Sequence, residues 1–391
     1  MTSDIHIIGS GHTRFGRLSE TLEDLIVTAA REAMAEAAID PADIDAVFLG
    51  HFNSGLVPDG FASSLIHQAD PALRFKPATR CENACASGAA AIHAGLNAIR
   101  AGRARNVLVV GAEKMTHRVT ADVTTALAGA GYQNDPQEAG LSFPQVFAVA
   151  AGAYAERYGD PMDAMALIAA KNHANAMNNP LAHMHKAMTY EFCNEVSEKN
   201  PLIAPPLRLS DCSLVTDGAA AIVLSSVDGA AGAASRRARI AAAEHVSDFL
   251  PMSRRDFLAF EGPERAIRMA YETAGISVAD LDFAEVHDCF TPAELLIYEA
   301  MGLASKGQGA RALDEGTVMA SGRTPVNLSG GLKAKGHPVG ATGVSMHALA
   351  FRQLTGQAGA MQKSGAEWGL TFNMGGAAVA NYATVLHADR A

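Results

Sequence analysis

A cysteine just ahead of a run of small residues is the first feature of this sequence that points to chemistry. The stretch NACASGAAA places Cys85 directly before a segment of helix formers at 89–100, which ends near Gly102. Free N–H groups and the positive end of the dipole at a helix N-terminus favour a thiolate. We therefore expect Cys85 to be a nucleophile, although a small cysteine buried against the start of a helix would give the same pattern.

A histidine on a glycine-rich loop is the second candidate. In KAKGHPVGATG, His337 stands among glycines that allow tight turns, and a helix is predicted at 341–354. Such a histidine is well placed to act as a base, but a structural loop histidine would look the same. This loop is the C-terminal counterpart of the Cys85 segment, so we expect the two helix N-termini to converge on one cleft.

The stretch EVHDCFTPAE carries a histidine and a cysteine between a strand and a helix. The strand should end near His287, and Thr291 with Glu294 predicts a capping box at the helix start. His287 and Cys289 would then lie at the carboxyl end of a parallel strand, where ligands bind in such sheets. The alternatives are an imidazole that bonds a backbone carbonyl and a buried thiol without a chemical role.

The stretch FNMGGAAVANY places Gly375 and Gly376 between two strands. A hairpin turn is one interpretation of these glycines. The other is that a backbone N–H at this turn donates to an oxyanion that develops during a reaction.

Composition limits the classes of protein to consider. The chain has 391 residues, a formal net charge of -10 and a pI near 5.8, with 49% hydrophobic and 18% charged residues. This length suits about two or three domains. A basic arm or a sustained Lys/Arg run is missing, which argues against a nucleic-acid partner. Local basic side chains or helix N-termini can still hold an anionic ligand.

Cysteine usage and the chain ends predict a cytoplasmic protein with reduced thiols. The five cysteines are an odd number for a disulfide framework, and the N-terminus MTSDIHIIGSG lacks the features of a signal peptide. No apolar run approaches the ~18 residues of a membrane span. Cys81 and Cys85 lack a second matching pair, so we expect no metal site. Motifs for dinucleotides, P-loops and G-x-S-x-G nucleophiles are also missing.

Apolar segments at strand and helix spacing alternate along the chain. This alternation predicts βαβ units and a largely parallel sheet with helices on both faces. Strands are expected at 5–8, 46–49, 106–110, 219–224, 370–373 and 378–386, and helices at 22–38, 89–100 and 341–354.

Two parts of the sequence repeat with a shift of 237 residues: AIDPADIDAVFLG at 38–50 and GISVADLDFAEVH at 275–287. Each follows an alanine-containing helical segment and leads into a strand. The chain therefore looks like a duplicated α/β unit. The pattern weakens at 116–212, and a long insertion of this kind usually forms a lid or a binding subdomain.

Together these motifs resemble the thiolase superfamily over essentially the whole chain. The resemblance implies an α/β thiolase fold, with duplicated βαβαβαββ halves in a five-layered α-β-α-β-α arrangement and an inserted loop domain. The implied boundaries are 1–115 with 213–232 for the N-terminal half, 116–212 for the insertion and 233–391 for the C-terminal half.

The motifs depart from those of common thiolases in two places. HDCF replaces Asn-Glu-Ala-Phe at 287–290, and NMG replaces the Cys-x-Gly motif at 373–375. This exchange is similar to sterol carrier protein 2-type thiolases and their archaeal and bacterial acetyl-CoA acetyltransferase relatives. The roles implied are acylation for Cys85, base for His337, acid/base for Cys289, a water or enolate contact for His287, an oxyanion N–H for Gly375 and a pantetheine contact for Ser213.

The resemblance implies a Claisen condensation of acyl-CoA with acetyl-CoA, or thiolysis of a β-ketoacyl-CoA, through an acyl-Cys85 intermediate in lipid metabolism. Coenzyme A thioesters would be the substrates, with no tightly bound cofactor, in a homodimer or homotetramer. One alternative is a thiolase-like acyltransferase to a non-CoA acceptor, working with a small OB-fold/zinc-ribbon partner. The other is a non-catalytic acyl-CoA-binding scaffold.

Overall fold

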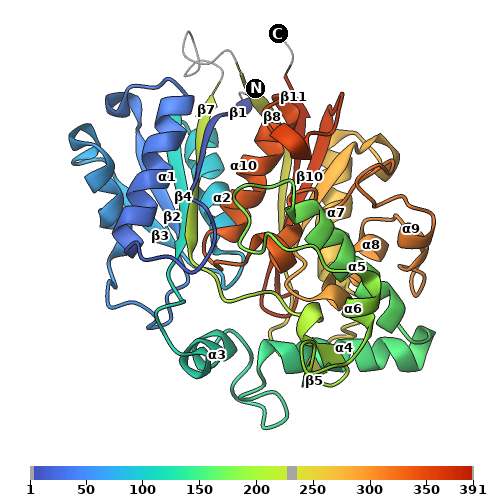
Figure 1. Cartoon of the computed structure of the whole chain (residues 1–391). Coiled ribbons are helices and arrows are strands. Elements are labelled where there is room, and N and C mark those ends of the chain that lie inside the picture. The colour runs from blue at the N-terminus through green and yellow to red at the C-terminus, as the bar shows by residue number, and fades with distance from the viewer. Residues whose placement is uncertain (1–3, 227–235, 390–391) are drawn as a thin grey trace.

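The computed structural model describes residues 4–226 and 236–389, which form a layered α/β structure (Figure 1). The strands are β1 (Ile5–His12), β2 (Ala46–Gly50), β3 (Ala78–Cys81), β4 (Asn106–Glu113), β5 (Leu202–Ala204), β6 (Leu207–Arg208), β7 (Gly218–Ser226), β8 (Ala238–Ser247), β9 (Phe283–Val286), β10 (Trp368–Gly375) and β11 (Ala380–Ala388). The helices are α1 (Leu22–Glu36), α2 (Ser87–Arg100), α3 (Thr120–Ala128), α4 (Phe143–Tyr158), α5 (Met162–Ala176), α6 (Tyr190–Asn194), α7 (Glu261–Ala274), α8 (Thr291–Ala300), α9 (Arg311–Asp314) and α10 (Thr342–Leu354).

The main sheet is mixed, so the prediction of a largely parallel sheet was wrong. Its strand order is β3-β2-β4-β7-β1-β8-β11-β10-β9. The pairs β2–β3, β2–β4 and β9–β10 are parallel, and the other five pairs are antiparallel. The physical reason lies in the connections. A tight turn joins β10 to β11, which allows only antiparallel pairing, and the long insertion after β4 returns the chain from the same end of the sheet.

The fold has five layers, in which three layers of helices alternate with two parts of the main sheet, as the resemblance implied. Helix α1 covers one outer face, α2 and α10 fill the middle, and α7 covers the other outer face (Figure 1). Successive side chains of β4 serve two layers. Val107 and Val109 pack in the central cluster with α2 and α10, whereas Leu108 and Val110 pack against α1. Burial on both faces explains the continuous apolar runs of the inner strands.

The two repeats occupy equivalent places, which confirms the duplicated halves. In each, a short 3-10 turn precedes β2 or β9. Asp45 accepts the N–H groups of Arg105 and Asn106 at the start of β4. Asp282 does the same for Glu367 and Trp368 at the start of β10. The predicted boundary between the halves, at 232 and 233, lies outside the described residues.

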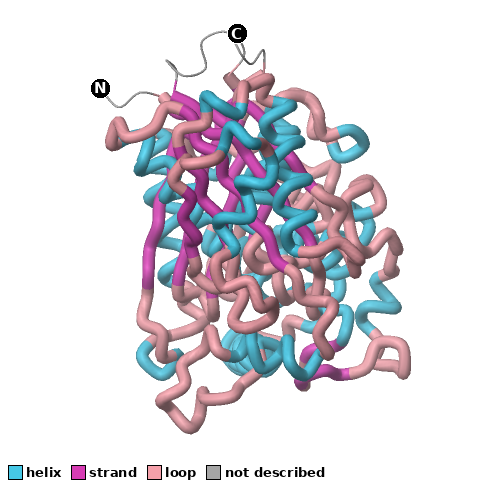
Figure 2. The backbone as a smooth tube through the Cα atoms, turned by 90° about the vertical axis from the view of Figure 1, so that its left-hand side faces the viewer, coloured by secondary structure: helices cyan, strands magenta, loops and turns pink. Residues whose placement is uncertain are grey.

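The segment at 116–212 contains α3 to α6 and the β5–β6 pair, most of it below the main sheet in Figure 1. Figure 2 shows the same region as loops and short helices beyond the strand ends. Asp217 joins the two ends of this segment, because its carboxylate accepts the N–H groups of Met115 and Thr116 and pairs with Lys114 Nζ at 2.8 Å. Within the described part of the chain, no helix is both long and apolar enough to cross a bilayer.

Buried neutral histidines are expected to make the fold sensitive to acid. Burial lowers the pKa of His173 and His337 to about 3 and that of His347 to about 4. Unfolding releases these groups to an ordinary pKa near 6.5, so the unfolded chain binds protons that the folded chain does not. Stability should therefore fall as the pH drops from about 6.5 towards about 4, by up to about 1.4 kcal/mol per pH unit for each histidine.

Urea unfolding at about pH 7 and about pH 5 measures this effect. The His347→Gln variant, which removes one of the three groups, should show a smaller loss between the two conditions. Equal stability of the wild-type protein at both pH values would contradict the expectation.

Candidate active site

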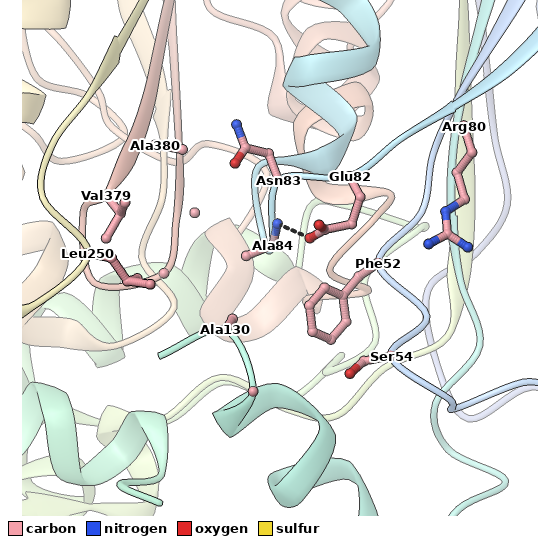
Figure 3. A pocket seen from close by; sticks show the side chains of 13 residues that line it. Phe52, Ser54, Arg80, Glu82, Asn83, Ala84, Ala130, Leu250, Val379 and Ala380 are labelled. Atoms are coloured by element: carbon pink, nitrogen blue, oxygen red, sulfur yellow. Dashed lines mark hydrogen bonds between the residues drawn. The ribbon is translucent and has the colours of Figure 1, made fainter. Parts of the chain in front are cut away.

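Cys85 lies on a tight turn between β3 and α2 that side chains hold in place. Ala84 has a positive φ of 51°, a strained conformation for a residue with a Cβ. Its N–H donates to Glu82 Oε1 at 2.6 Å (Figure 3). Ser87 Oγ accepts the N–H of Asn83 at 2.9 Å and donates to the carbonyl of Ala84 at 2.6 Å. These bonds fix the direction in which the Cys85 thiol leaves the turn.

The Cys85 thiol is protonated at neutral pH, contrary to the thiolate expected from the helix N-terminus. Burial, together with the charge of Glu113, raises its pKa to about 12. Helix α2 begins at Ser87, two residues further on, so Cys85 lies outside the first turn. Desolvation outweighs the helix dipole, because the dipole effect falls off within one turn.

The hydrogen bonds of His337 define its tautomer. Its Nδ1 lies 2.7 Å from Thr342 Oγ1, and that hydroxyl donates its own proton to the carbonyl of Pro338. Nδ1 must therefore carry the hydrogen, and Nε2 has a free lone pair. Nε2 is buried and bonds no other group among the described residues. Burial, with Lys335 nearby, lowers the pKa of His337 to about 3, so the ring is neutral.

The loop between β9 and α8 places His287 and Cys289 at the site, as predicted. Asp288, between them, points away and accepts the N–H groups of Leu332 and Lys333, which anchors the segment just before His337. Burial lowers the pKa of His287 well below its usual value, and burial with the neighbouring Cys85 thiol raises that of Cys289. Both groups are neutral in the resting protein.

The capping box predicted at the start of α8 is not formed. No side chain caps this helix at Phe290. Thr291 donates to Asp211 at 2.8 Å, and Glu294 forms a buried ion pair with Lys171 at 2.9 Å. The two side chains therefore connect α8 to the inserted segment. Buried polar groups need hydrogen-bond partners, and here residues of the inserted segment supply them.

Three chemically active side chains from distant parts of the chain meet at one point. The ligand atoms of Cys85, His287 and His337 all lie within 4.8 Å of one another. The two imidazole rings are perpendicular, with centroids 5.1 Å apart. This convergence requires glycine where α2 and α10 touch. A Cβ on Gly88 would lie 2.9 Å from the carbonyl oxygen of Gly340, and one on Gly343 would lie 2.4 Å from the N–H nitrogen of Ala89.

The turn after β10 brings a backbone donor to the nucleophile. The backbone N–H groups of Gly376 and of Cys85 itself act to lower the pKa of the Cys85 thiol, against the larger effect of burial. The role of Gly375 as oxyanion donor stays a prediction, and the N–H of Gly376 is a second candidate for that role. Gly376 lines both the cavity that contains the thiol and a second cavity, whose walls include Glu82, Asn83 and Ala84.

The cavity in front of Cys85 has a volume of about 500 Å³ and mostly apolar walls. Its walls include Cys85, His287, Cys289 and His337. Ser213, whose N–H donates to the carbonyl of Cys289 at 2.9 Å, also lines it. The inserted segment contributes most of the remaining wall, namely Thr120, Val123, Thr124, Leu127, Phe143, Pro144, Ile203, Leu209 and Cys212.

Sequence reasoning missed three residues that hold the site together. Glu113 accepts the N–H groups of Phe52, Asn53 and Gly340, and so joins the two halves. Thr342 fixes the tautomer of His337, and Asn373 bonds His287 Nδ1 at 2.8 Å. An acidic residue at the end of the apolar run NVLVVGAE was the one signal available for Glu113.

The chain matches two family descriptions along nearly its whole length. The thiolase N-terminal domain matches residues 5–228, and the thiolase C-terminal domain-like family matches residues 242–388. The chain therefore belongs to the thiolase family of acyltransferases, which confirms the resemblance seen in the motifs.

Two known relatives match at least 95% of this chain. The chain is 39% identical to an acetyl-CoA acetyltransferase of Methanothermobacter thermautotrophicus over 95% of this chain and 96% of the relative. It is 31% identical to sterol carrier protein 2 of Oryctolagus cuniculus over 96% of this chain and 71% of the relative.

Solved structures share the fold. An Ltp2-ChsH2(DUF35) aldolase covers 99% of this chain and 98% of its own, with a TM-score of 0.82 and 22% identity. Human mitochondrial 3-ketoacyl-CoA thiolase in complex with CoA gives the same coverage, with a TM-score of 0.75 and 20% identity.

Proposed function

We propose that this protein transfers acyl groups between coenzyme A thioesters, joining an acyl-CoA to acetyl-CoA or splitting a β-ketoacyl-CoA. The observation that carries the proposal is the convergence of Cys85, His287 and His337 within 4.8 Å in the wall of one apolar cavity. Cys289 lines the same cavity. Two thiols and two imidazoles suit covalent acyl transfer followed by carbon–carbon bond formation.

In the first step, the Cys85 sulfur attacks the thioester carbonyl while His337 Nε2 removes the thiol proton. The free lone pair of Nε2 suits this role. The N–H groups of Cys85 and Gly376 would hold the oxyanion, and in comparable sites one such donor is worth about 2.7–4 kcal/mol. The carbon–sulfur bond of the thioester then breaks, and the CoA thiolate takes the proton of Cys289. Acyl-Cys85, protonated His337 and the Cys289 thiolate remain.

In the second step, acetyl-CoA enters and the Cys289 thiolate removes a proton from its methyl carbon. The enolate oxygen would lie against the two imidazoles, where His287 and the now protonated His337 each offer an Nε2–H. The enolate carbon attacks the acyl carbonyl, the bond to Cys85 breaks, and His337 returns the proton to the sulfur. Thiolysis is the same sequence in reverse, so no redox change occurs in either direction.

The inserted segment at 116–212 is proposed to bind the acyl chain and the pantetheine arm. Its apolar side chains line the cavity, and both its ends are joined at Asp217. Ser213, which follows this segment, lines the same cavity and is proposed to contact pantetheine.

Cellular context is proposed from the family resemblance of the motifs. We infer a cytoplasmic homodimer or homotetramer active in lipid metabolism. A small OB-fold/zinc-ribbon partner is also proposed, since the solved Ltp2-ChsH2(DUF35) aldolase pairs a chain of this fold with a second component.

Incubation with acetyl-CoA tests the proposed function. The intact mass of the protein should rise by one acetyl group, with release of one equivalent of CoA, and acetoacetyl-CoA should form on longer incubation. A protein that gains no acetyl mass with acetyl-CoA, or with a panel of longer acyl-CoA and β-ketoacyl-CoA substrates, would refute the proposal.

Replacement of Cys289 should separate the two steps. Cys289→Ala should still form the acetyl-enzyme, because Cys85 and His337 remain and water can supply the proton that Cys289 gives to the CoA thiolate. Condensation, and the exchange of methyl protons of acetyl-CoA with deuterated water, should fall about 10²–10⁴-fold with loss of the base. Cys193→Ala, which removes a buried thiol that does not line the cavity, is the matched control. Undiminished deuterium exchange in Cys289→Ala would assign the proton transfer to another group.

A further inference from the structure

His287 faces a residue that decides which of its nitrogens carries the hydrogen. Asn373 Nδ2 lies 2.8 Å from His287 Nδ1 and 3.2 Å from the carbonyl oxygen of Cys85. A carbonyl oxygen can only accept a hydrogen bond, so the amide nitrogen of Asn373 must face it.

The opposite orientation of this amide is less favourable. It would place the oxygen of Asn373 against the carbonyl oxygen of Cys85. It would also turn the amide nitrogen to the place of Oδ1, where the described residues offer no hydrogen-bond partner. The observed orientation makes two bonds, and the alternative makes one bond and one repulsive oxygen–oxygen contact.

Because Asn373 donates, His287 Nδ1 must accept, and the hydrogen of this neutral ring lies on Nε2. His337 has the opposite tautomer, with its hydrogen on Nδ1 towards Thr342. The two rings therefore present one donor and one acceptor to the same point, although both are neutral, buried imidazoles.

We propose that Asn373 is the positioning residue that sets His287 as a hydrogen-bond donor and, by the same bond, keeps the site free of divalent metal. This inference rests on the proposed function, in which the His287 Nε2–H binds the enolate oxygen.

The inference about metal follows from the side chains that meet at this point. A thiol and two imidazole nitrogens within 4.8 Å of one another resemble the protein ligands of a zinc site. A metal would need a lone pair on His287 Nε2, and the bond from Asn373 leaves a hydrogen there. An aspartate at 373 would instead accept a hydrogen from Nδ1 and free Nε2, as carboxylates beside zinc-bound histidines do.

The first experiment reads the tautomer directly. Wild-type protein labelled with ¹⁵N-histidine is examined by long-range ¹H–¹⁵N correlation, with the His287→Asn variant to assign the signals. We expect the hydrogen of His287 on Nε2 and that of His337 on Nδ1. A hydrogen on Nδ1 of His287 would overturn the proposal. The spectrum needs neither turnover nor a folded position-373 variant, so it is independent of the acetylation test.

The second experiment uses the Asn373→Asp variant. We expect the His287 hydrogen to move to Nδ1, and kcat for condensation to fall about 10–100-fold with KM changed by less than about threefold. Added Co²⁺ should give a thiolate-to-cobalt absorption band in the variant and not in the wild type. A cobalt thiolate band of equal strength in both proteins, or an unchanged tautomer in the variant, would refute the proposal.

Thr371→Val is the matched control. Thr371 lies two residues earlier on β10 and makes a similar bond, 3.2 Å from Oγ1 to His347 Nε2. Its loss should leave the His287 tautomer, kcat and cobalt spectrum unchanged. A cobalt thiolate band or a shifted His287 tautomer in this variant would show that any disturbance of β10 has the same effect, and would remove the specific role of Asn373.

Discussion

Replacing Cys85 with alanine is expected to abolish acetylation of the protein and to lower turnover by on the order of 10⁶-fold, the scale seen when a covalent nucleophile is removed. The reason is that the Cys85 sulfur is the thiol that lies within 4.8 Å of a nitrogen of both imidazoles, so that His337 can remove its proton. The measurement is the intact mass after incubation with acetyl-CoA, together with the rate of acetoacetyl-CoA cleavage.

Cys81→Ala provides the control for this loss, because Cys81 is a half-exposed thiol at the end of β3, four residues earlier. Its acetyl mass and turnover should match the wild type. An acetyl group found on Cys85→Ala, or turnover within about a hundredfold of the wild type, would place the nucleophile elsewhere.

Replacing His337 with asparagine should slow acetyl-enzyme formation by about 10²–10⁴-fold and change its pH dependence. In the wild type, the thiol stays protonated up to about pH 12 and His337 stays neutral down to about pH 3. The acetylation rate should therefore be flat from about pH 6 to about pH 9. Without the base, attack depends on the small thiolate fraction, which rises tenfold per pH unit below the pKa.

Single-turnover acetylation at several pH values measures this change. The rate for His337→Asn should rise about tenfold per pH unit, so the defect shrinks in alkaline solution. His93→Gln alters a half-buried imidazole on α2 and should leave the flat wild-type profile unchanged. A flat but low profile for His337→Asn would mean that His337 positions the substrate and does not remove the thiol proton.

The sequence by itself determined the chemical inventory and the duplicated plan. Residue types at fixed spacing predicted Cys85, His287, Cys289 and His337 as candidate catalytic residues, and the repeat shifted by 237 residues located equivalent strands in both halves. These features are local, since periodicity, glycine content and turn residues act over a few neighbours. For the same reason, strands and helices were predicted close to their observed positions.

Strand direction and protonation were decided by the tertiary structure. Apolar runs such as NVLVV read the same in parallel and antiparallel sheets, so the mixed sheet became visible only through the connections. The pKa of Cys85 depends on burial and on Glu113, twenty-eight residues away in the sequence. Thr291 and Glu294 had the spacing of a capping box, yet buried partners from the inserted segment bond them instead.

The tautomers of His287 and His337 are likewise decided by the tertiary structure. The sequence supplies two imidazoles, but Thr342 and Asn373 assign one as acceptor and the other as donor. Hydrogen bonds act over about 3 Å in space whatever the separation along the chain. The proposed chemistry therefore depends on two neutral rings beside the Cys85 thiol, one offering a hydrogen-bond donor and the other an acceptor. An NMR spectrum of the substrate-free protein that showed the same tautomer for both histidines would contradict it.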